Sequence, residues 1–420
     1  MIKILQVRNI DSFVESRRQK TSEKDRKTVQ SILNDVKRNG DSAVKKYERK
    51  FNGRKTSQLR VSAKEIKEAR SKISREEVTA LQTMSARLWN SSPKIQIRIH
   101  ELFKKTTLDR FGAIPSVGCY IPGGQARYPS SVVMSVVPAK KAGVKRIVVV
   151  SPPDRDGKID PLTIVAAKMC GAIEIYKVGG AQAIGALAYG TKSIPKVDKI
   201  VGPGGRFVSI AKSLVSDQTA IDMVAGPTEL GIIADASSDP ELVGLDLISQ
   251  AEHSKDTMCF VITQSKTMAK QIQKSIEKLI PGVERSSIIK ESISKNGFIA
   301  VCKNQNEVIE LANKIAPEHM ELMVKNAKTL SKKITGAGLL LIGKNTPSAA
   351  SDYLLGTNHI LPTSGFGRTR GGLSVLDFLK LQTVVESKKS TLMKISKSLK
   401  ALTDAEGLPN HYKAVKRRLD

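Results

Sequence analysis

Hydrophobic positions in the first hundred residues recur at helical spacing among many charged ones. In residues 22–39 aliphatic side chains lie three or four positions apart, and Gly40 follows at a position where helices commonly end. Residues 62–73 begin with Ser62 and Glu65, the spacing of a helix-capping box. We predict surface helices here that pack on a larger body.

From about residue 111, short β-branched runs alternate with Gly- and Ala-rich helical patterns. Strands are predicted at residues 117–121, 146–150, 173–178, 199–201, 230–234, 258–263, 298–302, 322–324 and 339–342. The clearest helices between them are at residues 131–142, 162–169 and 240–251. Strands that alternate with helices are typical of βαβ units and of parallel sheets.

The pattern therefore predicts an α/β fold with two Rossmann-like α/β domains, mainly parallel sheets, and helical N- and C-terminal segments. A chain of 420 residues exceeds what one hydrophobic core usually fills, which agrees with two domains. We expect an N-terminal segment at 1–16, a larger domain from 17–119 and 230–373, a second domain at 120–229, and a helical tail at 374–420.

The chain is strongly basic, with 69 Lys and Arg against 40 Asp and Glu and a net charge of +29. Such an excess would suit a nucleic-acid-binding protein. The basic residues are spread along the whole chain, however, and aromatic residues, only 4% of the total, are not interleaved with them for stacking on bases. We prefer a lysine-rich surface on an ordinary enzyme, and a non-catalytic nucleic-acid-binding protein stays as an alternative.

Cysteine usage and hydropathy indicate a cytoplasmic protein. The four cysteines lie far apart and form no CxxC pair, so neither a disulfide framework nor a Cys-rich zinc site is indicated. The first residues lack the apolar run of a secretory signal. No stretch approaches the ~20 apolar residues of a membrane span. We therefore expect a soluble, cytoplasmic protein.

Glycine-rich sequences follow three of the predicted strands, at residues 120–124, 178–182 and 201–205. The G-x-G-x-x-G fingerprint of dinucleotide-binding proteins is absent. Glycine at the carboxyl end of a parallel strand lets a ligand approach the backbone closely, so a nucleotide or phosphate site is one interpretation. Tight turns that need glycine for themselves are the other.

Histidines are few and mostly late in the chain, next to acidic or amide side chains. Gln250 and His253 are three residues apart, so a helix that starts at residue 240 would place both on one face. Glu318 and His319 follow a proline that suits the first turn of a helix. His100, in an alternating run, is interpreted as a strand histidine without function.

Two further residues extend this pattern: Asp352, and His411 near the end of the chain. Histidine with an oxygen donor three residues away, plus a distant Asp and His, is compatible with a metal site of two nitrogen and two oxygen ligands. Helix caps and surface hydrogen bonds would give the same residues. Spacing alone does not decide between these interpretations.

Eight ordered motifs then point to one family. They are Gly-Cys-Tyr-Ile-Pro-Gly-Gly from residue 118, Tyr-Pro-Ser-Ser from 128, Val-Gly-Gly-Ala-Gln-Ala-Ile from 178, Ala-Gly-Pro-Thr-Glu from 225, Ser-Gln-Ala-Glu-His from 249, Ala-Pro-Glu-His from 316, Asp-Tyr-Leu-Leu-Gly-Thr-Asn-His-Ile-Leu-Pro-Thr from 352 and Glu-Gly-Leu-Pro-Asn-His from 406. With these motifs the sequence resembles the histidinol dehydrogenases along nearly its whole length.

The resemblance implies an enzyme that uses zinc and NAD to oxidise L-histidinol through L-histidinal to L-histidine, the last steps of histidine biosynthesis. One Zn²⁺ per subunit would orient the substrate, because zinc has no redox chemistry, while NAD takes the hydride. Matched residue by residue, the zinc ligands are Gln250, His253, Asp352 and His411. The larger domain would carry the metal and acid–base residues, and the second domain the nucleotide.

The resemblance also implies the roles of other residues. His319 would be the acid and base, and Glu318 would activate the water that hydrates the aldehyde. Substrate contacts would come from the metal ligands, His319 and the set Ser130, Thr228, His359 and Glu406. Nucleotide contacts would come from Tyr120, Gln182 and Gly205, where relatives usually have Asn instead of Gly205.

A homodimer whose C-terminal tail crosses to the other subunit is implied as well. Within the same superfamily, a zinc and NAD dehydrogenase for another polar alcohol is the nearest alternative function. Retention of Thr228, His359 and Glu406 argues against it. An intact set of metal ligands and acid–base residues argues against the nucleic-acid-binding alternative.

Overall fold

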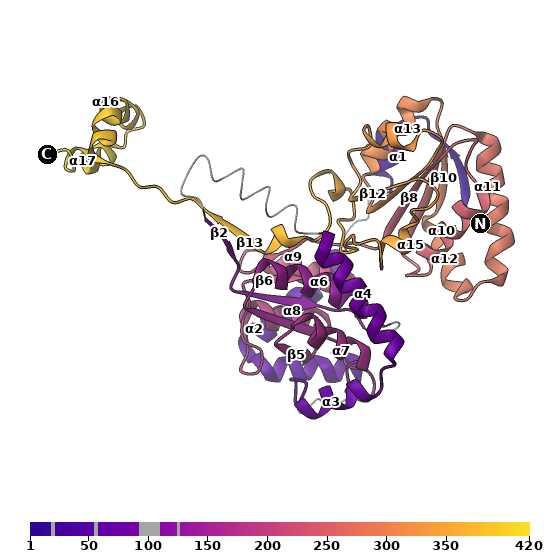
Figure 1. The fold of residues 1–420 in the computed structure, drawn as a ribbon, viewed down its shortest axis with the longest axis horizontal. Coiled ribbons are helices and arrows are strands. Elements are labelled where there is room, and N and C mark those ends of the chain that lie inside the picture. Colours follow the sequence, from indigo (N-terminus) through magenta and orange to yellow (C-terminus); the bar gives the residue numbers. More distant parts are fainter. Residues whose placement is uncertain (18–21, 54–57, 92–109, 124–126) are drawn as a thin grey trace. The chain divides into compact units, whose positions relative to one another are not determined.

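The computed structural model in Figure 1 describes residues 1–17, 22–53, 58–91, 110–123 and 127–420. The chain divides into two compact units. The first contains residues 1–94 and 113–379, and the second contains residues 95–112 and 380–420. The first unit holds two parallel sheets, so the predicted α/β class with mainly parallel sheets is confirmed.

One sheet has five parallel strands in the order β5-β4-β3-β6-β7. Its strands are β3 (Ser116–Tyr120), β4 (Arg146–Ser151), β5 (Glu174–Lys177), β6 (Lys199–Val201) and β7 (Ala220–Ile221). The helices that follow are α6 (Pro129–Ala142), α7 (Pro161–Cys170), α8 (Gly180–Tyr189) and α9 (Arg206–Val215). Val149 packs with α6 and α7, whereas Val148 and Val150 pack with α8 and α9, so apolar layers cover both faces.

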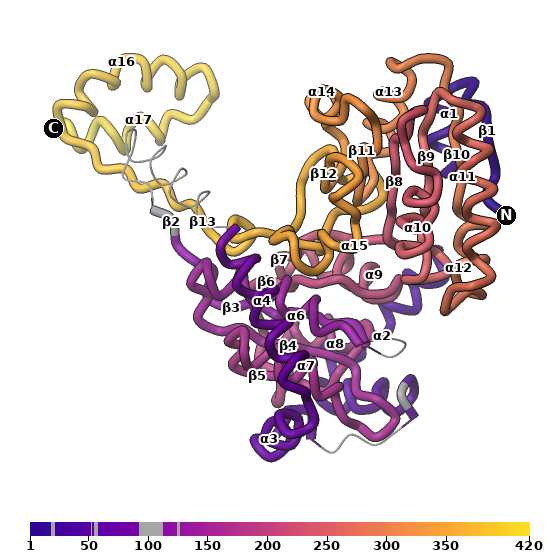
Figure 2. The backbone as a smooth tube through the Cα atoms, turned by 45° about the vertical axis from the view of Figure 1, so that its right-hand side comes forward, coloured from indigo at the N-terminus to yellow at the C-terminus, as the bar shows by residue number. Residues whose placement is uncertain are grey.

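The N-terminal helices pack on this sheet's helices (Figure 2). They are α2 (Glu23–Asn52), against α8 and α9, α3 (Ala63–Ser71), against α7, and α4 (Arg75–Ser91), against α6. The capping box of Ser62 and Glu65 is confirmed. The predicted end at Gly40 is confirmed: its φ of 50° and ψ of −129° are not helical, so α2 consists of two helices joined at a kink, in a conformation that glycine adopts at low cost.

These contacts differ from the expected division of the chain. Residues 17–119 were assigned to the domain of the metal residues, but α2, α3 and α4 contact the helices of the other sheet. Residues 1–16, expected as a separate segment, supply strand β1 (Lys3–Gln6) to the second sheet of this unit. The first difference arises because helical periodicity marks an apolar face without identifying the surface that covers it. The domain boundaries stay a prediction.

The second sheet has six parallel strands in the order β1-β10-β9-β8-β11-β12. They are β1 (Lys3–Gln6), β8 (Glu229–Ala234), β9 (Met258–Thr263), β10 (Phe298–Val301), β11 (His319–Met323) and β12 (Leu339–Ile342). One face is covered by α10 (Pro240–Ala251), α11 (Lys266–Leu279) and α12 (Ser286–Asn296). The other is covered by α1 (Ile10–Glu15), α13 (Gln305–Ile315) and α14 (Ala327–Ser331).

Short elements complete the first unit. They are α15 (Ser348–Ser351) and the 3-10 helices η1 (Ile280–Gly282), η2 (Phe366–Arg368) and η3 (Val375–Phe378). The two-stranded sheet pairs β2 (Arg110–Ala113) with β13 (Leu379–Gln382), and most of its residues belong to the second unit.

The second unit ends in two helices that pack against each other, α16 (Lys389–Ala405) and α17 (Pro409–Lys416). Met393 and Leu402 on α16 are 61% and 62% exposed, so part of this helix pair presents apolar surface. Within the described ranges, every helix is too short or too polar to cross a membrane.

Candidate active site

The centre of the candidate site is a histidine at the first position of strand β11. His319 is 1% exposed, its Nε2 lies 3.3 Å from Oδ1 of Asp352, and its Nδ1 lies 3.3 Å from the backbone oxygen of Glu229. The helix predicted to start after Pro317 is wrong. Ala316 ends α13 at a φ of 49°, and the chain then enters β11 directly.

Glu318, the residue before the histidine, is held at the start of the neighbouring strand β8. Its Oε2 accepts hydrogen bonds from the hydroxyl of Thr228 at 2.8 Å and from the backbone N–H of Glu229 at 2.9 Å. The same oxygen lies 3.9 Å from Nδ1 of His319. Because β8 and β11 are adjacent and parallel, their amino ends bring these groups together.

Glu229 is a site residue that the sequence analysis did not single out, although it lies in the motif from residue 225. Its carboxylate accepts hydrogen bonds from the backbone N–H of Ser364 at 3.0 Å and of Glu318 at 3.2 Å. Two glutamates thus bind each other's backbone across the strand pair. An acidic residue at the start of β8 and another directly before β11 form a pattern that could have identified it.

Burial controls the electrostatics of this cluster. Desolvation raises the pKa of Glu318 to about 7, against the opposing charge of His319 and the hydrogen bonds from Glu229 and Thr228. Desolvation also raises the pKa of Glu229 to about 8. Burial alone would lower the pKa of His319, but its hydrogen bond to Asp352 and the charges of Glu318 and Asp352 outweigh it and raise the pKa to about 9. The cluster can therefore exchange protons near neutral pH.

The predicted metal ligands of the first unit come from three segments. Gln250 lies in the last turn of α10 and is 2% exposed. The helix ends at Ala251, so His253 follows in a turn and does not share a helix face with Gln250 as predicted. The backbone N–H of His253 donates a hydrogen bond to the backbone oxygen of Gln250 at 3.2 Å. Asp352 directly follows α15.

Asp352 lies among three imidazoles. Burial would raise its pKa, but a hydrogen bond from His319 and the charges of His319, His359 and His253 lower it. The side chain of His253 is exposed, yet desolvation of its ring lowers its pKa despite the charges of Asp352 and Glu252. An amide oxygen, an imidazole and a carboxylate are donors that suit zinc. No group of three His, Cys, Asp or Glu side chains is assembled for a metal among the residues described.

The predicted substrate contacts are divided between the two units. His359 lies beside Asp352, with Nδ1 2.9 Å from its backbone oxygen, and its Nε2 is 3.3 Å from the hydroxyl of Ser131. Ser130, the residue predicted, is buried in α6 next to Ser131. Glu406 caps α16 and His411 lies in α17, both in the second unit. His100 and Gly124 lie outside the described residues.

The predicted nucleotide contacts lie at carboxyl ends of strands in the five-stranded sheet. Tyr120 ends β3, and its hydroxyl accepts a hydrogen bond from the backbone N–H of Gly180 at 3.1 Å. Gln182 donates from Nε2 to the buried carboxylate of Glu48 at 2.8 Å. Gly205 precedes α9 at an ordinary φ of −63°, with nothing within 4 Å of where a Cβ would lie, so this backbone does not itself require glycine.

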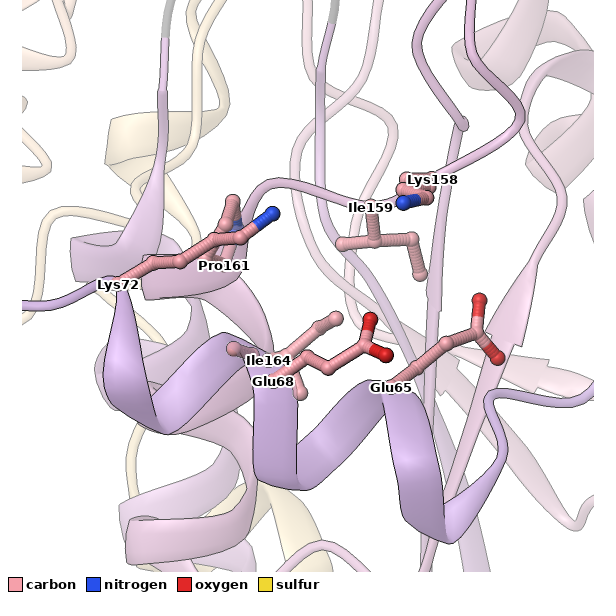
Figure 3. A pocket seen from close by; sticks show the side chains of 8 residues that line it. Glu65, Glu68, Lys72, Lys158, Ile159, Pro161 and Ile164 are labelled. Carbon is pink, nitrogen blue, oxygen red and sulfur yellow. The ribbon is translucent and has the colours of Figure 1, made fainter.

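A small cavity between α3 and the start of α7 is lined by other residues (Figure 3). Glu65, Glu68, Lys72 and Lys158 surround a cavity of about 30 Å³, the space of a single water molecule. None of the predicted site residues lines it. It does not compete as a substrate site.

Comparison with known proteins identifies the family. The family model described as "Histidinol dehydrogenase" matches residues 15–419. The chain belongs to the histidinol dehydrogenase family. It is 43% identical over 396 residues to the histidinol dehydrogenase of Methanocaldococcus jannaschii, covering 93% of this chain and 92% of that protein. It is 40% identical to that of Oceanobacillus iheyensis, with the same two coverages.

A solved structure agrees. The crystal structure of histidinol dehydrogenase from Elizabethkingia anophelis has a TM-score of 0.90 and 32% sequence identity, and covers 100% of this chain and 98% of that chain. Membership in the histidinol dehydrogenase family confirms the resemblance found in the eight motifs and makes the protein an NAD-dependent oxidoreductase.

The contact between His319 and Asp352 gives a prediction for the metal-free protein. Asp352→Asn removes a carboxylate that raises the pKa of His319, so this pKa should fall from about 9 toward the ordinary 6.5. The His319 ring signals, followed by NMR as a function of pH, measure the change. A pKa that stays near 9 in the variant would show that Asp352 is not its cause.

Proposed function

We propose that this member of the histidinol dehydrogenase family oxidises L-histidinol to L-histidine in two NAD-dependent steps, with zinc holding the substrate. The observation that carries the proposal is the pairing of Glu318 and His319 at the joined amino ends of β8 and β11. Two proton-transfer groups of different kind, both buried, suit a reaction that removes a proton from an alcohol and later activates water.

Gln250, His253 and Asp352, completed by His411, are the residues that would hold the metal. Bound zinc would supply a positive charge that orients a neutral imidazole and amine of the substrate. Asp352 is the one anion of the set. With its charge shared with a bound ion, Asp352 would do less to hold the proton on His319.

His319 is assigned the acid–base role in both oxidations. In the metal-free protein its pKa is about 9, so it carries a proton near neutrality. With the charge of Asp352 engaged elsewhere, desolvation would be the largest remaining influence on the pKa of His319, and it favours the neutral base against the charge of Glu318. The neutral ring can then accept the proton of the substrate hydroxyl as the hydride leaves for NAD.

Glu318 is assigned the role of activating the water that hydrates the aldehyde. A carboxylate with a pKa of about 7 is a far better base than an ordinary one with a pKa of 4.5. The Thr228 hydroxyl and the Glu229 N–H fix one carboxylate oxygen, which leaves the other to contact water. The hydrated aldehyde is again an alcohol, so the second oxidation can reuse His319.

The remaining contacts complete the proposal. Ser130, Thr228, His359 and Glu406 would contact substrate, and Tyr120, Gln182 and Gly205 would contact NAD. The protein would act as a homodimer in the cytoplasm, with the tail of each subunit completing the site of the other. The exposed apolar side chains of α16 support the proposal that this tail packs against another subunit.

Activity and metal content test the function together. The wild-type protein should form two NADH per L-histidinol, lose this activity on chelation and regain it with Zn²⁺. His253→Ala should fail to retain stoichiometric zinc, because it removes a nitrogen ligand. Metal analysis and NADH absorbance measure both. Full activity in a verified metal-free preparation would exclude the zinc assignment.

The two half-reactions separate the roles of the acid–base pair. Glu318→Gln should slow the oxidation of L-histidinal more than that of L-histidinol, because only the aldehyde must first be hydrated. His319→Asn should slow both steps by about 10²–10⁴-fold, the usual contribution of a placed proton-transfer group. Single-turnover kinetics from each substrate give the rates. Equal losses in both steps for Glu318→Gln would contradict the division of roles.

Complementation tests the shared site. His253→Ala and His411→Ala should each be inactive alone. Dissociated, mixed and reassociated, they should form heterodimers with one intact site and recover up to about half of the native activity per dimer. Native mass spectrometry confirms the heterodimers. A tail that folds back on its own subunit leaves one lesion in each site, and no activity returns.

A further inference from the structure

Strand β11 carries a second buried acid, Glu321, two residues after His319. Side chains two apart on a strand point to the same face, and Met323, next in this series, packs with α10. Glu321 is 2% exposed, and its Oε1 accepts the backbone N–H of Ser348, the first residue of α15, at 2.6 Å. Its Oε2 is fully buried and has no hydrogen-bond partner while the carboxyl is ionised.

The neighbour of Glu321 is another acid, Asp246 on α10. Their carboxyls are within hydrogen-bonding reach of each other. Two carboxylates have four acceptor oxygens and no donor, so the contact is repulsive when both are ionised. One shared proton turns it into a hydrogen bond and satisfies Oε2.

The surroundings favour that proton. Desolvation and the charge of Asp246 raise the pKa of Glu321 to about 8, and desolvation raises that of Asp246 to about 6. Within the described part of the chain, the buried thiol of Cys259 on β9 is a further titratable group that faces Glu321. Among the residues described, no cation forms an ion pair with either acid.

We propose that Glu321 and Asp246 share one proton and, with the backbone N–H of Ser348, hold α10 and α15 on strand β11. This makes Glu321 a positioning residue for the metal ligands, an inference that rests on the proposed zinc site. Each partner of Glu321 lies close in sequence to a proposed metal ligand. Asp246 is one helical turn before Gln250, and Ser348 is one turn before Asp352. The strand itself begins with His319.

Glu321→Gln is the informative variant because it imitates the protonated acid. The amide oxygen can still accept the Ser348 N–H, and the amide nitrogen can donate to Asp246 at any pH. Wild type and variant should therefore bind zinc equally at pH 7. Above pH 8 the wild-type pair loses its shared proton, so the ratio of the two zinc affinities should move in favour of the variant.

Zinc affinity is measured on the full-length protein by competition with a chelator between pH 7 and 10. Glu321→Ala removes both contacts and should weaken binding about 10–100-fold, the range for groups that orient metal ligands. One control should follow the wild type at every pH. Glu241→Gln makes the same chemical change at an exposed position of α10.

Thermal unfolding of the metal-free proteins tests the shared proton without zinc. The folded state holds this proton more tightly than an unfolded carboxyl of pKa 4.5, so the wild type should be most stable relative to Glu321→Gln at low pH. The advantage should decline as the pH rises from about 4.5 to 8 and then level off. A constant difference in melting temperature would overturn the shared proton.

The zinc experiment separates the two proposals. If wild type binds no zinc, the proposed function fails, whatever Glu321 does. If wild type binds zinc and Glu321→Ala binds it as tightly, or if Glu321→Gln has the wild-type pH dependence, the positioning role of Glu321 is wrong while the zinc site stands. Should Glu321→Ala fail to fold, the pH dependence of Glu321→Gln decides alone.

Discussion

The site depends on the parallel pairing of β8 with β11, which brings together residues 90 positions apart in the chain. The register pairs His319 with Leu230, so both strands begin at the same level. Glu318 can then accept the hydroxyl of Thr228 and the N–H of Glu229 with one oxygen. A shift of one residue would turn His319 to the opposite face of the sheet, away from Asp352.

This arrangement uses the amino ends of parallel strands, whereas the glycine-rich loops use carboxyl ends in the other sheet. At the amino ends of β8 and β11, hydrogen bonds and opposite charges offset the cost of burying charged groups. Asp352 and Glu318 face the imidazole of His319, and backbone N–H groups donate to Glu229 and Glu318. The cluster is stable as a whole, but removing one charged group would leave its buried partners without compensation. The low dielectric that makes it costly also gives Glu318 and His319 their shifted pKa values.

The loop after β6 shows how a buried ion pair fixes a turn at the edge of the five-stranded sheet. Gly202 has a φ of +111°, and a Cβ there would lie 2.1 Å from the backbone oxygen of Tyr120, so no other residue fits. Its N–H donates to Asp222 at 2.8 Å, and its oxygen accepts from Lys212 at 2.9 Å. These two side chains form a buried ion pair, so one pair of opposite charges holds both polar groups of a single residue.

The sequence by itself determined the family, the α/β class and most strands, because eight motifs and the alternation of apolar runs are local properties. The strands at 199–201, 258–263 and 339–342 and the helix at 240–251 have the predicted bounds. It misplaced Glu318 and His319 on a helix, since a proline after α13 suits either a helix start or an extended chain. It also missed Glu229 and Glu321. The order β9-β8-β11 brings these acids to their partners, and only long-range packing decides that order, because the pattern within one strand does not encode its neighbour.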